Sequence, residues 1–145
     1  MAEPKAKVVW KGKMAFEGSS ISGFTLPLDT SVDSGGEDNG FRPMELLLVG
    51  LAGCTAMDVI SILQKKRQDV TNLEVRVVEA ERAADHPRIY THIVLEYVVT
   101  GRNIERAAVE RSVELSSTKY CSVEAMLSKA AKIENRITIL EAEQV

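Results

Sequence analysis

Apolar and polar residues alternate near the N-terminus, a pattern typical of short strands with one buried face. Val8 and Trp10 share one face of the first expected strand. Gly12 and the stretch 18–20 predict turns, and residues 21–28 predict a third strand. The N-terminal part of the chain therefore predicts a small sheet.

The segment 29–41 is polar and glycine-rich and has no hydrophobic period. It is long for a connection inside a compact domain. Two interpretations stay open at this point. The segment is either a loop with a function or a partner against it, or a surface excursion without a role.

A long helix is predicted for residues 43–67, where apolar residues recur at spacings of three and four. Pro43 suits the first helical turn, and the cations Lys65–Arg67 complement the negative end of the helix dipole. The helix is apolar around most of its circumference, which favours a central, buried position. Gly50 and Gly53 each cost about 1 kcal/mol relative to alanine inside a helix. Such glycines indicate that another helix or backbone approaches closely.

Strands return in the second half of the chain. Alternation predicts one strand from residue 72, with a bulge after Val78, and another over residues 89–99. Residues 133–139 predict a final strand.

Two helices are predicted between the last two of these strands. Asn103 is expected to cap a helix that ends near residue 117, and Ser122 to cap a second, short helix. The order of elements is that of an α+β fold, with helices packed on mainly antiparallel sheet.

Composition narrows the possible functions. The 145 residues are 45% hydrophobic and 27% charged, ordinary values for a globular domain. The net charge is −3 and no basic run carries interleaved aromatics, so nucleic acid is not expected as a partner. Two histidines and two cysteines nearly exclude a zinc site with four such ligands, and no metal or cofactor is expected.

The N-terminal residues also bear on location. They lack the apolar core of a signal peptide. The longest apolar stretch, residues 44–63, is interrupted by Asp58 and several small residues, which argues against a membrane span. The expected location is the cytoplasm, where thiol pairs stay reduced unless they carry out redox chemistry.

Cys54 and Cys121 are the candidate reactive residues, separated by 66 residues. Unpaired cysteines are most often small buried hydrophobes, so a purely structural role stays open. Backbone amides at the expected helix start favour a thiolate at Cys121. Asp58 lies one turn after Cys54 on the same helix face and opposes a thiolate there unless it is itself paired. Spacing alone does not decide between a redox pair and two core residues.

Two motifs carry a family resemblance. Residues 42–55, RPMELLLVGLAGCT, resemble the hallmark of the OsmC/Ohr family of osmotically inducible and organic hydroperoxide resistance proteins. Residues 119–123, KYCSV, resemble the family's second cysteine motif. The likeness covers essentially the whole chain and is nearest to the YhfA-like branch. It implies one OsmC-like domain over residues 1–145, with a strand-rich part at 5–28, a central helix at about 43–67 and a C-terminal ββααβ part at 72–143.

The resemblance also implies an assembly and a reaction. It implies an intertwined homodimer in which the N-terminal strands join the partner's sheet and the two cysteine-bearing helices pack together. By carry-over, Cys54 is the peroxidatic thiol that reduces an organic hydroperoxide to an alcohol. Cys121 is then the resolving thiol that forms a disulfide with it. A dithiol reductant, of the lipoyl type or a small thiol, restores the pair.

The chain departs from the family pattern at two supporting positions. Met44 follows Pro43 where the peroxidase branch has glutamate, and Glu45 comes one place later. No arginine precedes Arg42, so Arg42 and Glu45 are the candidate supporting residues. The departures keep a second hypothesis open: a redox sensor or a small apolar ligand-binding protein on the same fold, with little turnover. A third is that both thiols are inert core residues.

Overall fold

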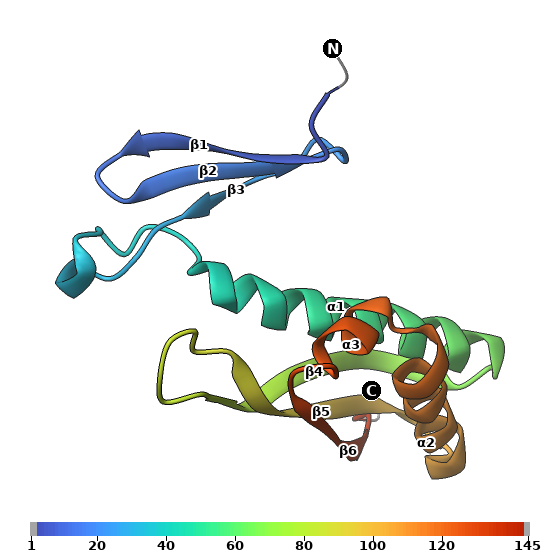
Figure 1. The fold of residues 1–145 in the computed structure, drawn as a ribbon. Helices are drawn as coiled ribbons and strands as arrows, with labels where there is room; N and C mark the ends of the chain where they lie inside the picture. The colour runs from blue at the N-terminus through green and yellow to red at the C-terminus, as the bar shows by residue number, and fades with distance from the viewer. Residues whose placement is uncertain (1–2, 144–145) are drawn as a thin grey trace. The chain divides into compact units, whose positions relative to one another are not determined.

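Residues 3–143 are described by the computed structural model, and they divide into an N-terminal unit ending at Leu47 and a C-terminal unit beginning at Leu48. Strands open the chain, a long helix follows, and two more strands, two helices and a last strand complete it (Figure 1). This order agrees with the predicted α+β class.

The N-terminal unit is built on an antiparallel meander. Its strands are β1 (Ala6–Gly12), β2 (Ala15–Ser20) and β3 (Thr25–Leu28). The prediction of three strands is confirmed, but the predicted turn at 18–20 is wrong. Gly18 pairs with Val8 and with Leu26 inside β2, and the chain reverses after Ser20 instead. A side chain built on Gly18 would lie 3.4 Å from Leu28 and 3.5 Å from Leu26, ordinary contact distances within the sheet.

The segment 29–41 is a folded loop centred on the buried Asp29. The Asp29 carboxylate accepts hydrogen bonds from the backbone amides of Thr30 at 2.7 Å and of Glu37 and Asn39 at 3.2 Å. These amides lower the pKa of Asp29, because they stabilise its charged form. The loop contains a short 3₁₀ turn, η1 (Val32–Ser34). A buried acceptor with three amide donors gives this segment one defined path.

The long helix α1 (Pro43–Lys65) matches the predicted helix closely. One face of it is fully buried, at Leu51, Thr55, Val59 and Leu63. Other apolar side chains stay exposed in the single chain, including Val49 and, at 74%, Met57. The helix is therefore the long central element that was predicted, but one chain covers only one of its faces.

The sheet of the C-terminal unit has β5 (Tyr90–Arg102) between β4 (Asp69–Arg82) and β6 (Lys132–Glu141). β4 and β5 are antiparallel, and their register shifts between Val77 and Glu79, which confirms the predicted bulge. β6 runs parallel to β5, so the sheet is mixed. Alternate side chains of β5 are fully buried: Ile93, Leu95, Tyr97 and Val99.

The crossover between β5 and β6 begins with helix α2 (Arg106–Leu115). The predicted cap at Asn103 is wrong, because the N-cap is Glu105 and Asn103 adopts a left-handed conformation with φ of 51°. Asparagine is one of the few residues that tolerate this region, which explains its presence in the turn before the helix.

The crossover ends with a π-helical turn, η2 (Ser116–Tyr120), and helix α3 (Ser122–Leu127). The predicted cap at Ser122 is wrong, because Ser122 is the first residue of α3. The cap is Cys121, whose sulfur accepts the hydrogen bond that a serine hydroxyl usually accepts.

Candidate functional site

The fold brings the two cysteines together. The Sγ atoms of Cys54 and Cys121 and a carboxylate oxygen of Asp58 all lie within 4.8 Å of one another. Cys54 and Asp58 come from consecutive turns of α1, and Cys121 comes from the start of α3. Both thiols are free; Cys54 is half-buried and Cys121 is buried. The pair is thus close enough for a small side-chain movement to bond the two sulfurs.

Local backbone structure fixes Cys121. Its amide donates to the Ser116 carbonyl at 2.8 Å, which closes the π-helical turn. Its sulfur accepts from the Glu124 amide at 3.3 Å. Single π-helical turns are frequent at functional sites, and this one aims the cysteine at α1.

The predicted thiolate preference of Cys121 is overturned by burial. Desolvation raises the pKa of Cys121 to about 12, and the adjacent Cys54 thiol contributes in the same direction. The Glu124 amide lowers it, as expected from the helix start, but by less. Cys121 is therefore a neutral thiol that needs a base before it can act as a nucleophile.

A buried chain of hydroxyl groups leads to Asp58. Thr55 Oγ1 lies 2.8 Å from the Tyr97 hydroxyl and 2.7 Å from Ser116 Oγ. Ser116 Oγ donates to Asp58 Oδ2 at 2.9 Å. Burial raises the pKa of Tyr97, so its hydroxyl stays protonated. The chain holds the Asp58 carboxylate beside the two sulfurs.

Glu124 adds a second carboxyl near the thiols. It is 5% exposed, and its Oε1 accepts from Ser117 Oγ at 2.6 Å. Its Oε2 has no hydrogen-bond partner within residues 3–143. Burial raises its pKa, which favours the neutral acid. Sequence reasoning missed Glu124, Ser116 and Tyr97, because none of them shares a local motif with Cys54.

The two supporting candidates lie at the start of α1, in the N-terminal unit. The Arg42 guanidinium pairs with Asp38 and donates to the Gly40 carbonyl at 3.2 Å. Glu45 accepts from the Arg42 amide at 3.2 Å, as in a helix capping box. Within their own unit, both side chains stabilise the loop and the helix start.

A second group of possible metal ligands lies on the surface of the C-terminal unit. It consists of Glu79, Glu81 and His92. The two glutamates are exposed, and His92 Nε2 is already 3.1 Å from Glu134. Exposed carboxylates around a paired histidine are typical of a solvated surface.

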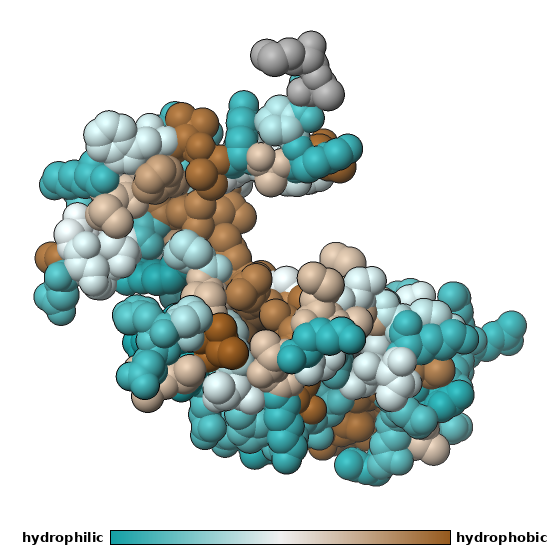
Figure 2. Space-filling model, viewed as in Figure 1, coloured by the Kyte–Doolittle hydropathy of each residue, from teal (hydrophilic) through white to brown (hydrophobic). Residues whose placement is uncertain are grey.

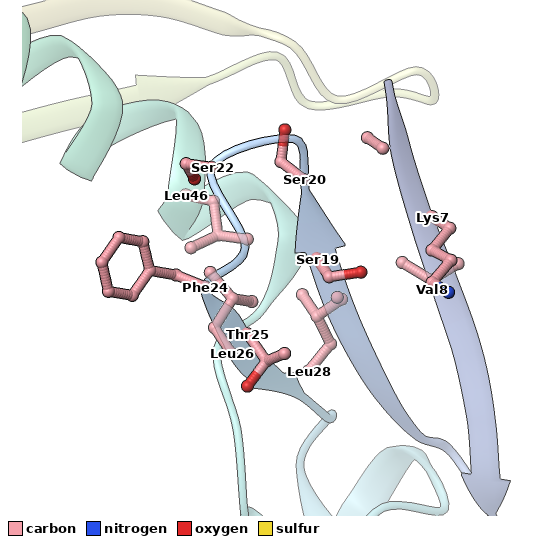
Figure 3. Close-up of a pocket in the computed structure, with 12 residues that line it drawn as sticks. Lys7, Val8, Ser19, Ser20, Ser22, Phe24, Thr25, Leu26, Leu28 and Leu46 are labelled. Atoms are coloured by element: carbon pink, nitrogen blue, oxygen red, sulfur yellow. The ribbon is translucent and has the colours of Figure 1, made fainter. Parts of the chain in front are cut away.

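The N-terminal unit contains an apolar hollow of about 550 Å³. Val8, Leu26, Leu28 and Leu46 contribute side chains to its lining, with Phe24 at its edge (Figure 3). Phe24 is 81% exposed. Apolar surface is gathered on this sheet in the space-filling view (Figure 2).

Comparison with known proteins identifies relatives over nearly the whole chain. The sequence profile of the OsmC-like protein family matches residues 35–136. YhfA of Escherichia coli strain K12 is 45% identical over 138 residues, which cover 95% of this chain and 99% of YhfA.

Solved structures agree with this relationship. A hypothetical protein from Aquifex aeolicus VF5 superposes with a TM-score of 0.83 at 31% identity, over 99% of this chain and 100% of its own. An OsmC organic hydroperoxide resistance protein from Legionella pneumophila shares the fold, with a TM-score of 0.69 at 16% identity, over 92% of this chain and 94% of its own. By length and hydropathy alone α1 would suffice to cross a membrane, but in this soluble fold it is the core helix.

Proposed function

The chain belongs to the OsmC-like protein family, and on that premise we propose that it is a thiol-dependent peroxidase that reduces organic hydroperoxides to alcohols. The observation that carries the proposal is the approach of Cys54 to Cys121 within 4.8 Å, with the Asp58 carboxylate beside both. A structural role would explain each cysteine separately. It would not explain why both lie against an acceptor for protons.

The first step takes place at Cys54, the more accessible thiol. Its sulfur, as thiolate, attacks the distal oxygen of the hydroperoxide. The O–O bond breaks, the alkoxide takes up a proton and leaves as alcohol, and Cys54 becomes a sulfenic acid.

The second step joins the two sulfurs. Cys121 attacks the Cys54 sulfur, a disulfide forms, and the sulfenic oxygen leaves as water. Because burial keeps Cys121 protonated, the step needs a base. Asp58 is the group in position to take the Cys121 proton and pass it to the leaving oxygen. A dithiol of the lipoyl type, or a small thiol, then reduces the disulfide by exchange.

Arg42 and Glu45 are proposed as supporting residues only through the resemblance of the motif that contains them. Arg42 would supply positive charge for the thiolate, and Glu45 would orient that arginine. The Arg42–Asp38 ion pair and the hydrogen bond from the Arg42 amide to Glu45 would then hold these side chains for catalysis, in addition to stabilising the loop.

The proposed working form is a cytoplasmic homodimer of single OsmC-like domains. Three observations support a second copy. Val49 and Met57 of α1 are exposed, and the apolar hollow of the N-terminal unit is open. A side chain built on Gly50 or Gly53 would meet nothing within 4 Å in the single chain, so their close neighbour has to come from elsewhere.

A redox sensor or small apolar ligand-binding protein is the second candidate. It is favoured by Met44 in place of the family glutamate and by the neutral Cys121, both of which we expect to slow turnover. A sensor would form its disulfide once per oxidation event and would not consume excess hydroperoxide.

The deciding experiment measures consumption of cumene hydroperoxide with dihydrolipoamide as reductant. The peroxidase proposal expects many turnovers per chain and none in Cys54→Ser. It also expects Cys121→Ser to accumulate a dimedone-reactive sulfenic acid at Cys54. A single stoichiometric oxidation with no further hydroperoxide consumption would support the sensor. Thiols that do not react with the hydroperoxide would contradict both the peroxidase and the sensor.

A further inference from the structure

We propose that the reduced Cys54, Asp58 and Cys121 side chains form a binding site for Zn²⁺. The fourth position of a tetrahedral zinc is then left to water or an exogenous ligand. The proposal does not require peroxidase turnover, and it concerns the state in which both thiols are reduced.

Geometry carries the proposal first. Three donor atoms lie within 4.8 Å of one another. Two thiolates on a tetrahedral zinc, each with a bond of about 2.3 Å, stand about 3.8 Å apart. The adjustment is therefore at most about 1 Å, within the reach of side-chain rotation. Cys54 and Asp58, four residues apart on α1, project from one helix face, as helical ligand pairs do.

The surrounding groups already hold the carboxylate as a metal ligand is usually held. Asp58 Oδ2 accepts from Ser116 Oγ at 2.9 Å, and Ser116 is fixed in turn by Thr55 and Tyr97. Within residues 3–143 no hydrogen bond ties the other carboxylate oxygen, Oδ1. Outer hydrogen bonds that orient a ligating carboxylate are a regular part of metal sites.

The donor set selects the metal. Two thiolates favour soft or borderline cations, zinc and Cu⁺ among them. The carboxylate oxygen is a hard ligand and fits Zn²⁺ better than Cu⁺. Zinc sites with three protein ligands and one open position are the kind that exchange ligands. The sequence nearly excluded a closed site of four cysteines and histidines, and the fold supplies a different set of three.

Zinc would connect to the proposed peroxidase as a competitor. Bound zinc occupies the lone pair with which Cys54 attacks a hydroperoxide. If the reaction proceeds, the zinc dithiolate, one hydroperoxide and two protons give the disulfide, one alcohol, one water and free Zn²⁺. This last consequence rests on the proposed function, whereas binding to the reduced protein does not.

Co²⁺ titration of the reduced protein tests the site directly. We expect a thiolate-to-cobalt charge-transfer band that saturates at one ion per chain and that Zn²⁺ abolishes by displacement. Cys54→Ser and Cys121→Ser should each remove most of the band, and Asp58→Asn should weaken binding at least tenfold. His92→Gln, which alters the surface group of possible ligands, is the matched control and should bind like the wild type.

A second measurement needs no variant. Bound Zn²⁺ should protect both thiols of the wild-type protein from iodoacetamide, and protein alkylated at both thiols should show no cobalt band. Binding that survives alkylation, or that His92→Gln removes, would overturn the proposal. So would an Asp58→Asn protein with unchanged affinity. A protein that binds zinc but consumes no hydroperoxide would refute the peroxidase alone.

Discussion

The two units of this chain bury their apolar residues to very different extents. The C-terminal unit has a core of fully buried side chains, among them Leu51, Val59, Leu95 and Val99. In the described part of the N-terminal unit, the buried residues are Gly18, Asp29 and Gly36, and no large apolar side chain is buried. One unit therefore contains its own hydrophobic core, whereas the other is a sheet whose apolar face stays exposed in the single chain.

The candidate chemistry follows the same division. Both cysteines lie in the C-terminal unit, where buried polar groups fix their positions. The N-terminal unit offers an apolar hollow instead. Thiol chemistry needs rigid geometry and a dry environment, so it belongs with the core. Association needs exposed apolar area, so the proposed dimer would use the sheet.

Leu95→Ala and Leu26→Ala give the sharpest contrast between the units. Leu95 is fully buried, so its truncation should lower the free energy of unfolding by about 2–5 kcal/mol at any protein concentration. Leu26 lines the hollow, so its truncation should act through association, and its cost should disappear once dilution dissociates the wild-type dimer. Urea unfolding at several protein concentrations measures both. A concentration-independent loss for Leu26→Ala would mean that the sheet is not a dimer surface.

Thr55→Val probes the buried polar chain of the C-terminal unit. Valine has nearly the same shape but leaves the Tyr97 and Ser116 hydroxyls without their shared partner. Unfolding free energy should fall by about 1–3 kcal/mol. The double variant with Tyr97→Phe is the control. It should recover part of the loss, because it removes one of the stranded groups.

Gly50→Ala separates helix stability from assembly. Nothing within 4 Å obstructs a side chain at Gly50 in the single chain, so alanine should stabilise an isolated helix by about 1 kcal/mol. In a dimer with closely packed helices, the same methyl group should weaken association. Analytical ultracentrifugation measures the dimer constant, and Ala56→Ser on the same helix serves as a comparison. An unchanged dimer constant would mean that no second helix packs closely against Gly50.

Glu124→Gln should change the pH dependence of stability. Burial raises the pKa of Glu124 above 4.5, so the unfolded chain ionises first as the pH rises through that value. Stability should therefore fall above pH 4.5, until the folded-state pKa is passed. Glutamine removes this contribution, and urea unfolding at pH 4, 5, 6 and 7 should show a flatter profile. Glu110→Gln, an exposed change on α2, should leave the wild-type profile in place.

Local patterns predicted most of the elements correctly. Alternation identified the strands, spacings of three and four identified α1 from Pro43, and the phase change after Val78 identified the bulge in β4. The errors in the predicted elements concerned where a strand or helix begins or ends. Gly18 lies in a strand and Asn103 precedes its helix by more than one residue, because neighbouring strands and turns decide such boundaries.

The candidate site was predicted only in part. The motifs pointed to Cys54 and Cys121, whereas Asp58 was noted only as a charge one turn after Cys54 that opposes a thiolate there. Ser116, Tyr97 and Glu124 could not be found in this way. They reach the site from η2, β5 and α3, and although Glu124 directly follows the KYCSV motif, nothing in that motif marks it as a site residue.

The sequence by itself determined the elements, their order and the two thiols, because periodicity and helix signals act between residues close along the chain. Tertiary structure alone decided that sulfurs 66 residues apart would meet. It also decided that Cys121 would be a buried, neutral helix cap. The physical reason is that desolvation depends on every atom packed around a group, and most of those atoms come from distant parts of the chain.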